Sequence, residues 1–344
     1  MIKLGVWRPD QFYPAPPQSP LDRIYYALSR TRVSFHLLTT PRQPSLGDIQ
    51  FFERLLPYVC LSSGVYRTTY RQRFKDLDPL VNGILSRYFA VSEKLLVEDW
   101  AASDCLTSSE WAKSLLPLFP QLNFVASDLL LFLIEARETG TEKRFIFEPD
   151  GNPLQYVDPP FVIRLGQPEP IVFPFNWLLY QSAQRRWRNA RTSWNIPESW
   201  KNSLTGGPIQ QGKFELRKLS LIHPEALQVF DENPHFMVHR HSIFEPSTRA
   251  NHVIRSMNIY NRAYFSEEQL RQGVRCVGES LLPGGIWIVG RTIDKNATVH
   301  EVTIFQKGVS GEFEILDRVG SGSEIEKLAL TVKLKGNEPC LRKA

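Results

Sequence analysis

Residues 95–106 read LLVEDWAASDCL, an apolar run that ends in two acids and leads into a turn of small residues. A short apolar run between polar residues is typical of a strand that is buried on both faces of a parallel sheet. The tetrad Thr107-Ser108-Ser109-Glu110 fits a capping box, in which the first and last side chains bond to each other's backbone. We therefore expect a strand that ends near Asp99 and a helix over residues 108–116.

A second strand and helix follow in the same order. Residues 123–128 (NFVASD) predict a strand that ends in an acid, and residues 129–138 predict a helix that Gly140 ends. Strand–helix alternation predicts an α/β fold, a Rossmann-like doubly wound sheet that is mostly parallel. Further expected elements are helices at 80–88 and after the capping box 266–269, and strands at 236–241, 252–257, 286–290, 302–305 and 328–332.

The alternation is interrupted at two places. Residues 1–75 combine a proline-rich arm with short helical pieces, which predicts an N-terminal extension before a sheet domain over residues 76–335. Residues 147–222 hold many prolines but too many aromatic residues for a solvated linker. We interpret this insert as a lid that forms the substrate region, and residues 336–344 as a C-terminal tail.

Helix 176–191 within the insert carries tryptophans together with four arginines. One interpretation is a lid helix that packs its aromatic residues and leaves the arginines in solvent. The other is a surface for an anionic partner or a membrane face.

Composition limits the class of protein. The 344 residues carry a net charge of +5 with 42% hydrophobic and 22% charged residues, as in an ordinary globular protein. No run reaches the roughly 18 apolar residues that a transmembrane helix needs, and no apolar signal core opens the chain. The four scattered cysteines suit a reducing, cytoplasmic setting without disulfides. The modest charge makes a nucleic-acid partner an unfavoured prediction.

The order of these pieces resembles the class I S-adenosylmethionine (SAM)-dependent methyltransferases, and looks closest to the chemotaxis-receptor branch. Three segments carry the resemblance: residues 124–128 with the following helix, residues 253–260 with Tyr264-Phe265 beyond, and the exit LLPGGIWIVG at 281–290. The resemblance covers roughly residues 80–135 and 235–335. It implies SAM as the cofactor and methyl transfer to a small molecule or peptide.

The resemblance also implies a cofactor site at the carboxyl ends of the strands. Asp128 would accept hydrogen bonds from both ribose hydroxyls of SAM, although an aspartate here also suits a helix cap. In the family, an acid after the first strand precedes glycines at alternate positions. Here Asp99 is the acid, and Ala101, Ser103 and Cys105 stand where the glycines would be. A Cβ restricts positive φ and hinders close approach of a ligand, which raises the alternative of a degenerate site.

Three further residues belong to the implied site. Ser242 follows the third strand, where the family often has an acid near the adenine. Asn258 and Tyr260 follow the fourth strand and are the candidate catalytic residues, with Asn258 also a cofactor contact. Met257 replaces the arginine of the receptor enzymes, so their acidic-substrate recognition is not carried over. An asparagine in a loop often just satisfies backbone groups, which is the alternative for Asn258.

Three functions from different classes therefore remain open, of which the third is an RNA-associated or membrane-associated partner protein that uses the basic helix 176–191. The first is a SAM-dependent methyltransferase for a small molecule or peptide, with the basic insert favouring an anionic substrate. The second is a catalytically degenerate binding protein that keeps the fold. His239 and His241 share one strand face, but no third ligand has convincing spacing, so no metal site is predicted.

Overall fold

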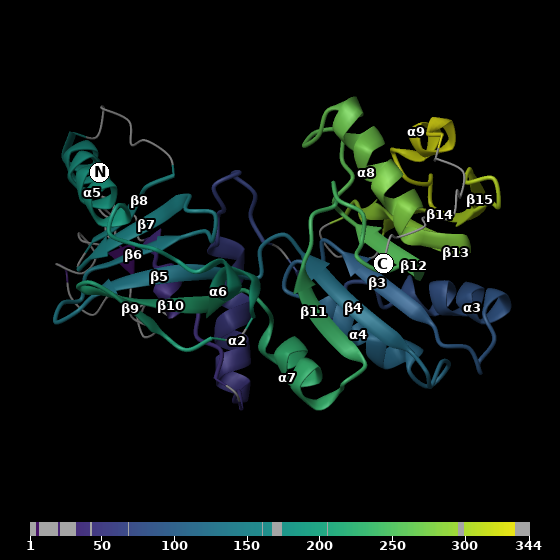
Figure 1. Cartoon of the computed structure of the whole chain (residues 1–344), viewed down its shortest axis with the longest axis horizontal. Coiled ribbons are helices and arrows are strands. Elements are labelled where there is room, and N and C mark those ends of the chain that lie inside the picture. The colour runs from purple at the N-terminus through teal and green to yellow at the C-terminus, as the bar shows by residue number, and fades with distance from the viewer. Residues whose placement is uncertain are drawn as a thin grey trace, which may run out of the picture. The chain divides into compact units, whose positions relative to one another are not determined.

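The structure is a computed structural model that describes residues 5–6, 20, 32–41, 43–67, 69–159, 161–166, 174–204, 206–294 and 299–333. The chain divides into two compact units. One consists of residues 1–68 and 130–224, and the other of residues 69–129 and 225–344. Each unit has its own sheet (Figure 1). Within the described residues, no helix is long and apolar enough to cross a membrane.

The second unit holds a seven-stranded sheet in the order β11-β4-β3-β12-β13-β14-β15. The first five strands run parallel and the last two continue as an antiparallel meander. Their bounds are β3 Leu96–Trp100, β4 Asn123–Asp128, β11 Phe236–Arg240, β12 Asn251–Met257, β13 Leu281–Thr292, β14 His300–Lys307 and β15 Phe313–Val319. The predicted α/β class with a mostly parallel, Rossmann-like sheet is confirmed. Its four neighbouring strands β11, β4, β3 and β12 end at one edge of the sheet.

Helices cover both faces of this sheet. They are α3 Asp78–Tyr88, α4 Leu106–Leu115, α7 Pro224–Glu232, α8 Glu267–Ser280 and α9 Glu326–Thr331. Successive residues of a strand point to opposite faces. On β12, Ile254 packs in one cluster with Leu270 and Val274 of α8, whereas Arg255 stacks on Trp111 of α4. The sheet is therefore a buried central layer between α8 and α4.

The first unit is built on a six-stranded antiparallel sheet in the order β8-β7-β6-β5-β10-β9. The strands are β5 Phe132–Glu138, β6 Arg144–Phe147, β7 Pro153–Asp158, β8 Phe161–Arg164, β9 Ile209–Gln211 and β10 Phe214–Ser220. Its helices are η2 Phe35–Leu37, α2 Leu46–Leu55, η3 Leu56–Tyr58, α5 Pro174–Arg191 and α6 Glu198–Asn202, and β1 Gly5–Val6 pairs with β2 Arg32–Val33. Most of the predicted proline-rich arm at the start of residues 1–75 and all of the 336–344 tail lie outside the described residues.

The helix predicted over 129–138 is wrong, because these residues form β5. The strand pairs along both edges, with β6 and β10, and its first five residues are all buried. A continuous apolar run of this kind cannot be separated from a buried helix by periodicity alone. The interruption of the parallel sheet accordingly begins at Leu130 and not at residue 147. The interpretation of residues 147–222 as a lid stays a prediction.

Three local expectations also need correction or confirmation. Thr107 and Glu110 lie inside α4, and the helix is capped instead by Cys105 without a side-chain bond, so the first capping box is wrong. The second is confirmed, since Ser266 and Gln269 bond reciprocally at the start of α8. The terminal strand expected over 328–332 is mostly the helix α9.

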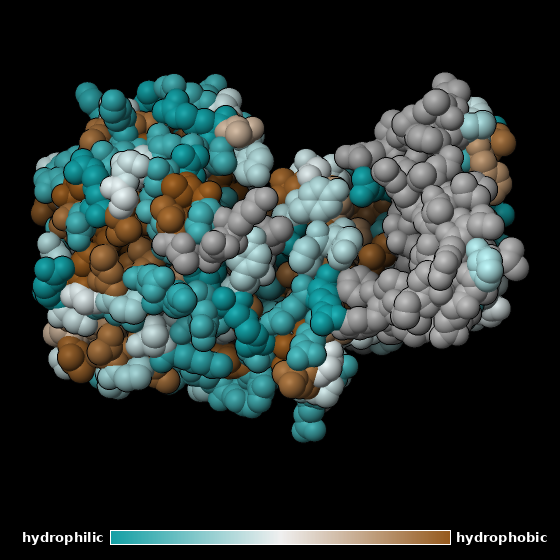
Figure 2. All heavy atoms as spheres, turned by 180° about the vertical axis from the view of Figure 1, so that it is seen from behind, coloured by the Kyte–Doolittle hydropathy of each residue, from teal (hydrophilic) through white to brown (hydrophobic). Residues whose placement is uncertain are grey.

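The surface is chemically mixed. Figure 2 shows hydrophobic and hydrophilic residues interspersed over the face of the unit that carries the seven-stranded sheet. Apolar atoms contribute a large part of any folded surface, so this mixture by itself marks no interface. The three cysteines in the described part of the chain, Cys60, Cys105 and Cys276, are free and buried.

Candidate cofactor-binding site

The turn between β3 and α4 has an unusual backbone. Ala101, Ser103 and Cys105 have φ angles of 55°, 56° and 63°, in the left-handed region that glycine adopts without strain. A non-glycine residue there costs roughly 1–2 kcal/mol. These three are the positions that the sequence aligns with the family's glycines. The chain thus keeps a glycine-like path through this turn although the glycines themselves are absent.

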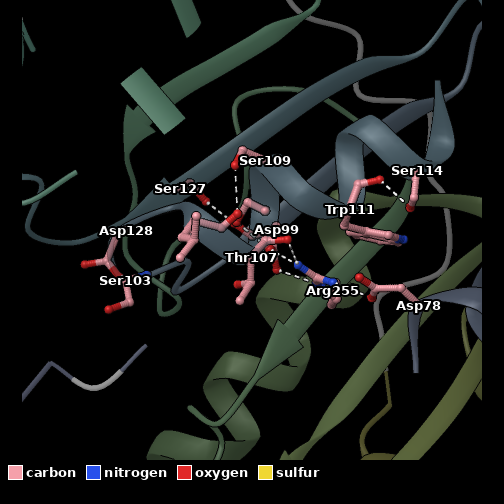
Figure 3. A network of polar contacts seen from close by, with 12 residues as sticks. Asp78, Asp99, Ser103, Thr107, Ser109, Trp111, Ser114, Ser127, Asp128 and Arg255 are labelled. Carbon is pink, nitrogen blue, oxygen red and sulfur yellow. Dashed lines mark hydrogen bonds and ion pairs between the residues drawn. The ribbon is translucent and has the colours of Figure 1, made fainter. Parts of the chain in front are cut away.

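Backbone hydrogen bonds hold the turn against β4. The Ser103 N–H donates to Oδ2 of Asp128 over 2.9 Å (Figure 3). The Ala102 N–H donates to the carbonyl of Ser127, also over 2.9 Å. The Cys105 N–H donates to the Ala102 carbonyl, again over 2.9 Å. The structure therefore brings Asp128 and the turn together as predicted. Asp128 fixes the turn and does not cap a following helix, because β4 leads into β5.

Asp99, near the end of β3, is engaged within the protein. Arg255 donates from Nε to Oδ1 over 3.0 Å and from Nη2 to Oδ2 over 2.5 Å, and the Ser108 hydroxyl donates to Oδ2 over 2.6 Å (Figure 3). Arg255 is 1% exposed and stacks 4.1 Å above the Trp111 ring. Both carboxylate oxygens of Asp99 are occupied, so we withdraw Asp99 as a direct cofactor contact.

A second carboxyl group shares this buried cation. Nη1 of Arg255 lies 3.0 Å from Oδ1 of Asp78, the first residue of α3. Burial raises the pKa of Asp78 to about 7, in spite of the opposing charge of Arg255. Burial lowers the pKa of Arg255, but the charges of Asp99 and Asp78 outweigh it and the net shift is upward. The group is an internal brace between β3, β12, α3 and α4.

Ser242 lies in the turn after β11. Its hydroxyl accepts from the Phe244 N–H over 3.3 Å, and its carbonyl accepts from the Glu245 N–H over 3.0 Å. The preceding His241 N–H donates to the Asp128 carbonyl over 3.0 Å, which ties the ends of β11 and β4 together. Ser242 is therefore near the correct strand end, and its contact with a cofactor stays a prediction.

Asn258 is the fourth residue of the predicted site with a left-handed backbone, at φ 61°. Its N–H donates to the Gly290 carbonyl and its side-chain Oδ1 accepts from the Thr292 N–H, both over 2.8 Å. These bonds join the end of β12 to β13. Gln72 is the one other non-glycine residue with positive φ among those the structure describes. Such strained residues gather at functional sites more often than elsewhere.

Tyr260 is placed in the core and not at the strand ends. It is 5% exposed, its ring meets Trp287 edge-on at 5.7 Å, and its hydroxyl donates to the Gly273 carbonyl over 3.4 Å. Burial, with the neighbouring Cys276, raises its pKa well above the usual value. A Cβ at Gly273 would lie 2.4 Å from the ring, so α8 needs a glycine there to receive the tyrosine. This packing role removes Tyr260 from our list of catalytic candidates.

A polar cluster next to the turn was not predicted. Glu98 is fully buried on β3, where Oε2 accepts from the Ser247 hydroxyl (2.7 Å) and the Asn251 amide (2.9 Å). Nε2 of His239 lies 3.3 Å from Oε1. Burial alone would raise the pKa of Glu98, but the hydrogen bonds from His239 and Ser247 lower it to about 2. The sequence signal that could have revealed this cluster is Glu98 itself, an acidic residue inside the apolar run of β3.

His241 lies beside this cluster, with its ring 4.5 Å from that of Trp100 at the end of β3. Burial lowers its pKa, which favours the neutral ring. Across the described ranges, no group of three His, Cys, Asp or Glu side chains is arranged to hold a metal ion. A cavity of about 510 Å³ lies elsewhere, in the first unit, between α2 and β10.

Comparisons with known proteins give likeness of structure and not of sequence. No family model and no curated protein matches the chain. Similar solved structures include an O-methyltransferase family protein from Burkholderia thailandensis (10% identity, 65% of this chain and 41% of that chain, TM-score 0.27). A second example is the CurJ carbon methyltransferase (12% identity, 69% of this chain and 39% of that chain, TM-score 0.31). A third is the sugar N-methyltransferase KedS8 from a Streptoalloteichus species (9% identity, 74% of this chain and 81% of that chain, TM-score 0.30).

The structures named here are thus an O-methyltransferase family protein, a carbon methyltransferase and a sugar N-methyltransferase. A further similar structure is an S-adenosylmethionine-dependent methyltransferase, SibL. This chain spans about two-fifths of the length of the O-methyltransferase family protein and of CurJ. At such low TM-scores we rest no inference on the alignments. The inferences below rest on the strand order, the turn and Asp128.

Proposed function

We propose that the edge formed by residues 101–105 and Asp128 binds SAM, and that the protein transfers its methyl group to a small molecule or peptide. The observation that carries this proposal is the left-handed backbone at Ala101, Ser103 and Cys105. Three strained residues at alternate positions are costly, and nothing in the packing of an ordinary strand-to-helix turn requires them. A path that lets backbone approach a nucleotide does require them.

The chemistry available at this edge suits a SAM-type ligand. A carboxylate at the end of β4 can accept hydrogen bonds from a ribose diol, and such charge-assisted bonds are strong. The first turn of α4 presents backbone N–H groups, which favour an anionic group such as a carboxylate. Methyl transfer from an activated sulfonium needs alignment above all, so the loss of Tyr260 as a catalytic candidate leaves the proposal intact. Asn258 remains a proposed contact for cofactor or substrate.

The competing function is a binding protein that keeps the fold without turnover. Two observations favour it. Each of the three turn residues carries a Cβ, and the acid of β3 is committed to Arg255. A ligand at this strand end would then find the Asp99 carboxylate already bonded to Arg255.

Calorimetric titration with SAM and S-adenosylhomocysteine separates the two functions. We expect binding by the wild type and a loss of about 10- to 100-fold in the Asp128→Asn variant, because the amide cannot supply a charge-assisted acceptor, worth roughly 1.5–3 kcal/mol. The matched control is Asp231→Asn, an exposed aspartate on α7. Binding together with methyl transfer supports the enzyme. Absence of SAM binding by the wild type overturns the proposed cofactor and enzyme, and supports the degenerate binding protein.

Finer assignments remain proposals. We propose a cytoplasmic protein, in keeping with its free cysteines. The chemotaxis-receptor branch stays a prediction. An anionic acceptor also stays a prediction.

A further inference from the structure

Helix α5 in the first unit has a composition that its packing does not explain. Its 18 residues, PFNWLLYQSAQRRWRNAR, include four arginines and no acidic residue. The buried side is formed by Asn176, Ala183, Trp187 and Ala190. Trp187 fixes the helix on the sheet, with its ring 5.6 Å from that of Phe145 and 5.3 Å from that of Phe147. The arginines are not needed for this contact.

All four arginines, namely Arg185, Arg186, Arg188 and Arg191, are exposed. No ion pair joins any of them to an acid in the described part of the chain. At 100° per residue, Arg185 lies nearly opposite Trp187, Arg186 and Arg188 lie about 100° from it on either side, and Arg191 lies about 40° from it. Arg191 reaches to within 3.6 Å of the Cβ position of Gly151. The charges are therefore spread across a broad face and are not gathered into one pocket.

Apolar side chains continue the same exposed face toward the start of the helix. Leu178 is 57% exposed and Phe175 is 43% exposed. Leu178 precedes Arg185 by seven residues, which places the two side chains on one side of the helix two turns apart. Phe175 lies one turn before Leu178. An aliphatic side chain in this position makes no favourable contact with the phosphodiester backbone of a nucleic acid. It can, however, enter the boundary between lipid headgroups and acyl chains.

We infer that the exposed face of α5 is a docking site for an anionic lipid surface. The charge spread suits a plane of negative headgroups, and the absence of acids along the helix removes repulsion. Arginine forms bidentate bonds with phosphate and carboxylate groups, as headgroups offer. Helix α5 would lie flat on the lipid headgroups and would not cross the bilayer, because its buried side is already packed on the sheet of its own unit. Binding is reversible, and each arginine contributes roughly fivefold at low ionic strength.

Vesicle sedimentation with the full-length chain tests this inference. The probes are phosphatidylcholine vesicles, alone and with 30% phosphatidylserine as roughly the anionic content of a cytoplasmic leaflet. We expect binding only to the anionic vesicles, with a loss of about 100-fold or more on replacing all four arginines by glutamine. The matched control replaces four exposed cations of the other unit, Arg87, Lys113, Arg275 and Lys327, by glutamine and changes the net charge equally. It should bind as the wild type does.

Two further measurements make the result decisive. Leu178→Ser should weaken vesicle binding severalfold while the circular dichroism melting curve stays that of the wild type. A fluorescent 20-nucleotide oligomer serves as the alternative anion. Equal loss of vesicle binding in the control, no binding to anionic vesicles, or tighter binding to the oligomer with no effect of Leu178→Ser would each overturn the lipid assignment. SAM titration is independent of all these variants, so failure here leaves the proposed methyl transfer unaffected.

Discussion

Restoring a glycine in the turn after β3 is the most direct test of the site. Ala101 has a φ of 55°, whereas the neighbouring Ala102 is not among the residues with positive φ. The Ala101→Gly and Ala102→Gly variants remove the same methyl group from adjacent positions. They differ in the backbone conformation that the new glycine inherits. Ala102→Gly is therefore a control within the same turn.

The expected changes in the free energy of unfolding have opposite signs in the two variants. At position 101, glycine relieves roughly 1–2 kcal/mol of left-handed strain and costs about 0.5–1 kcal/mol of chain entropy. The variant should gain up to about 1 kcal/mol. At position 102 there is no strain to relieve, and the methyl group is only 6% exposed. Loss of that burial adds about 0.8 kcal/mol to the entropic cost, so Ala102→Gly should lose about 1–2 kcal/mol.

Urea unfolding followed by circular dichroism measures the difference, about 2 kcal/mol between the variants. In thermal unfolding this corresponds to roughly 4–8 °C for a unit of 150–250 residues. SAM titration of Ala101→Gly supplies a second readout, since removal of a Cβ that hinders close approach should tighten binding. If both variants lose stability equally, the left-handed turn and the proposal built on it are refuted.

Three further predictions concern the interior of the same unit. Arg255→Met should lower the free energy of unfolding by about 3–5 kcal/mol in urea titrations, because it leaves two buried carboxyl groups without their cation; a loss below 1 kcal/mol would contradict the brace. Glu98 has a folded pKa of about 2 against 4.5, so its contribution of up to about 3 kcal/mol is present above pH 4.5 and is lost as the pH falls toward 2. Glu98→Gln should flatten the stability profile in that window, and an unchanged slope would exclude the assigned pKa. Tyr260→Phe should leave SAM affinity within about twofold, whereas Gly273→Ala should cost about 1–3 kcal/mol through its clash with the ring; a large loss of affinity in Tyr260→Phe without a loss of stability would return Tyr260 to the candidate site.

Much of the sheet domain could be predicted from local patterns. The runs at 95–99 and 123–128 carry enough apolar residues between polar ones to predict parallel strands, and β3 and β4 are confirmed at almost those bounds. The reciprocal bonds of Ser266 and Gln269 were also predictable, because a capping box spans only four residues. Asp128 was singled out because it ends such a strand. In each case the determining interactions lie within one element.

Tertiary structure decided what depends on distant partners. Residues 132–138 became a strand because β6 and β10 pair with both of its edges, which no periodicity within the segment reveals. From the sequence, Asp99 is available as a ligand. In the structure, Arg255, 156 residues away along the chain, donates hydrogen bonds to its carboxylate. Tyr260 became a core residue because Gly273 on α8 leaves room for its ring. The sequence by itself determined which short segments become strands and capped helices, since those depend on neighbouring residues. The tertiary structure alone decided which polar side chains face a ligand, since burial and pairing across strands take up the others.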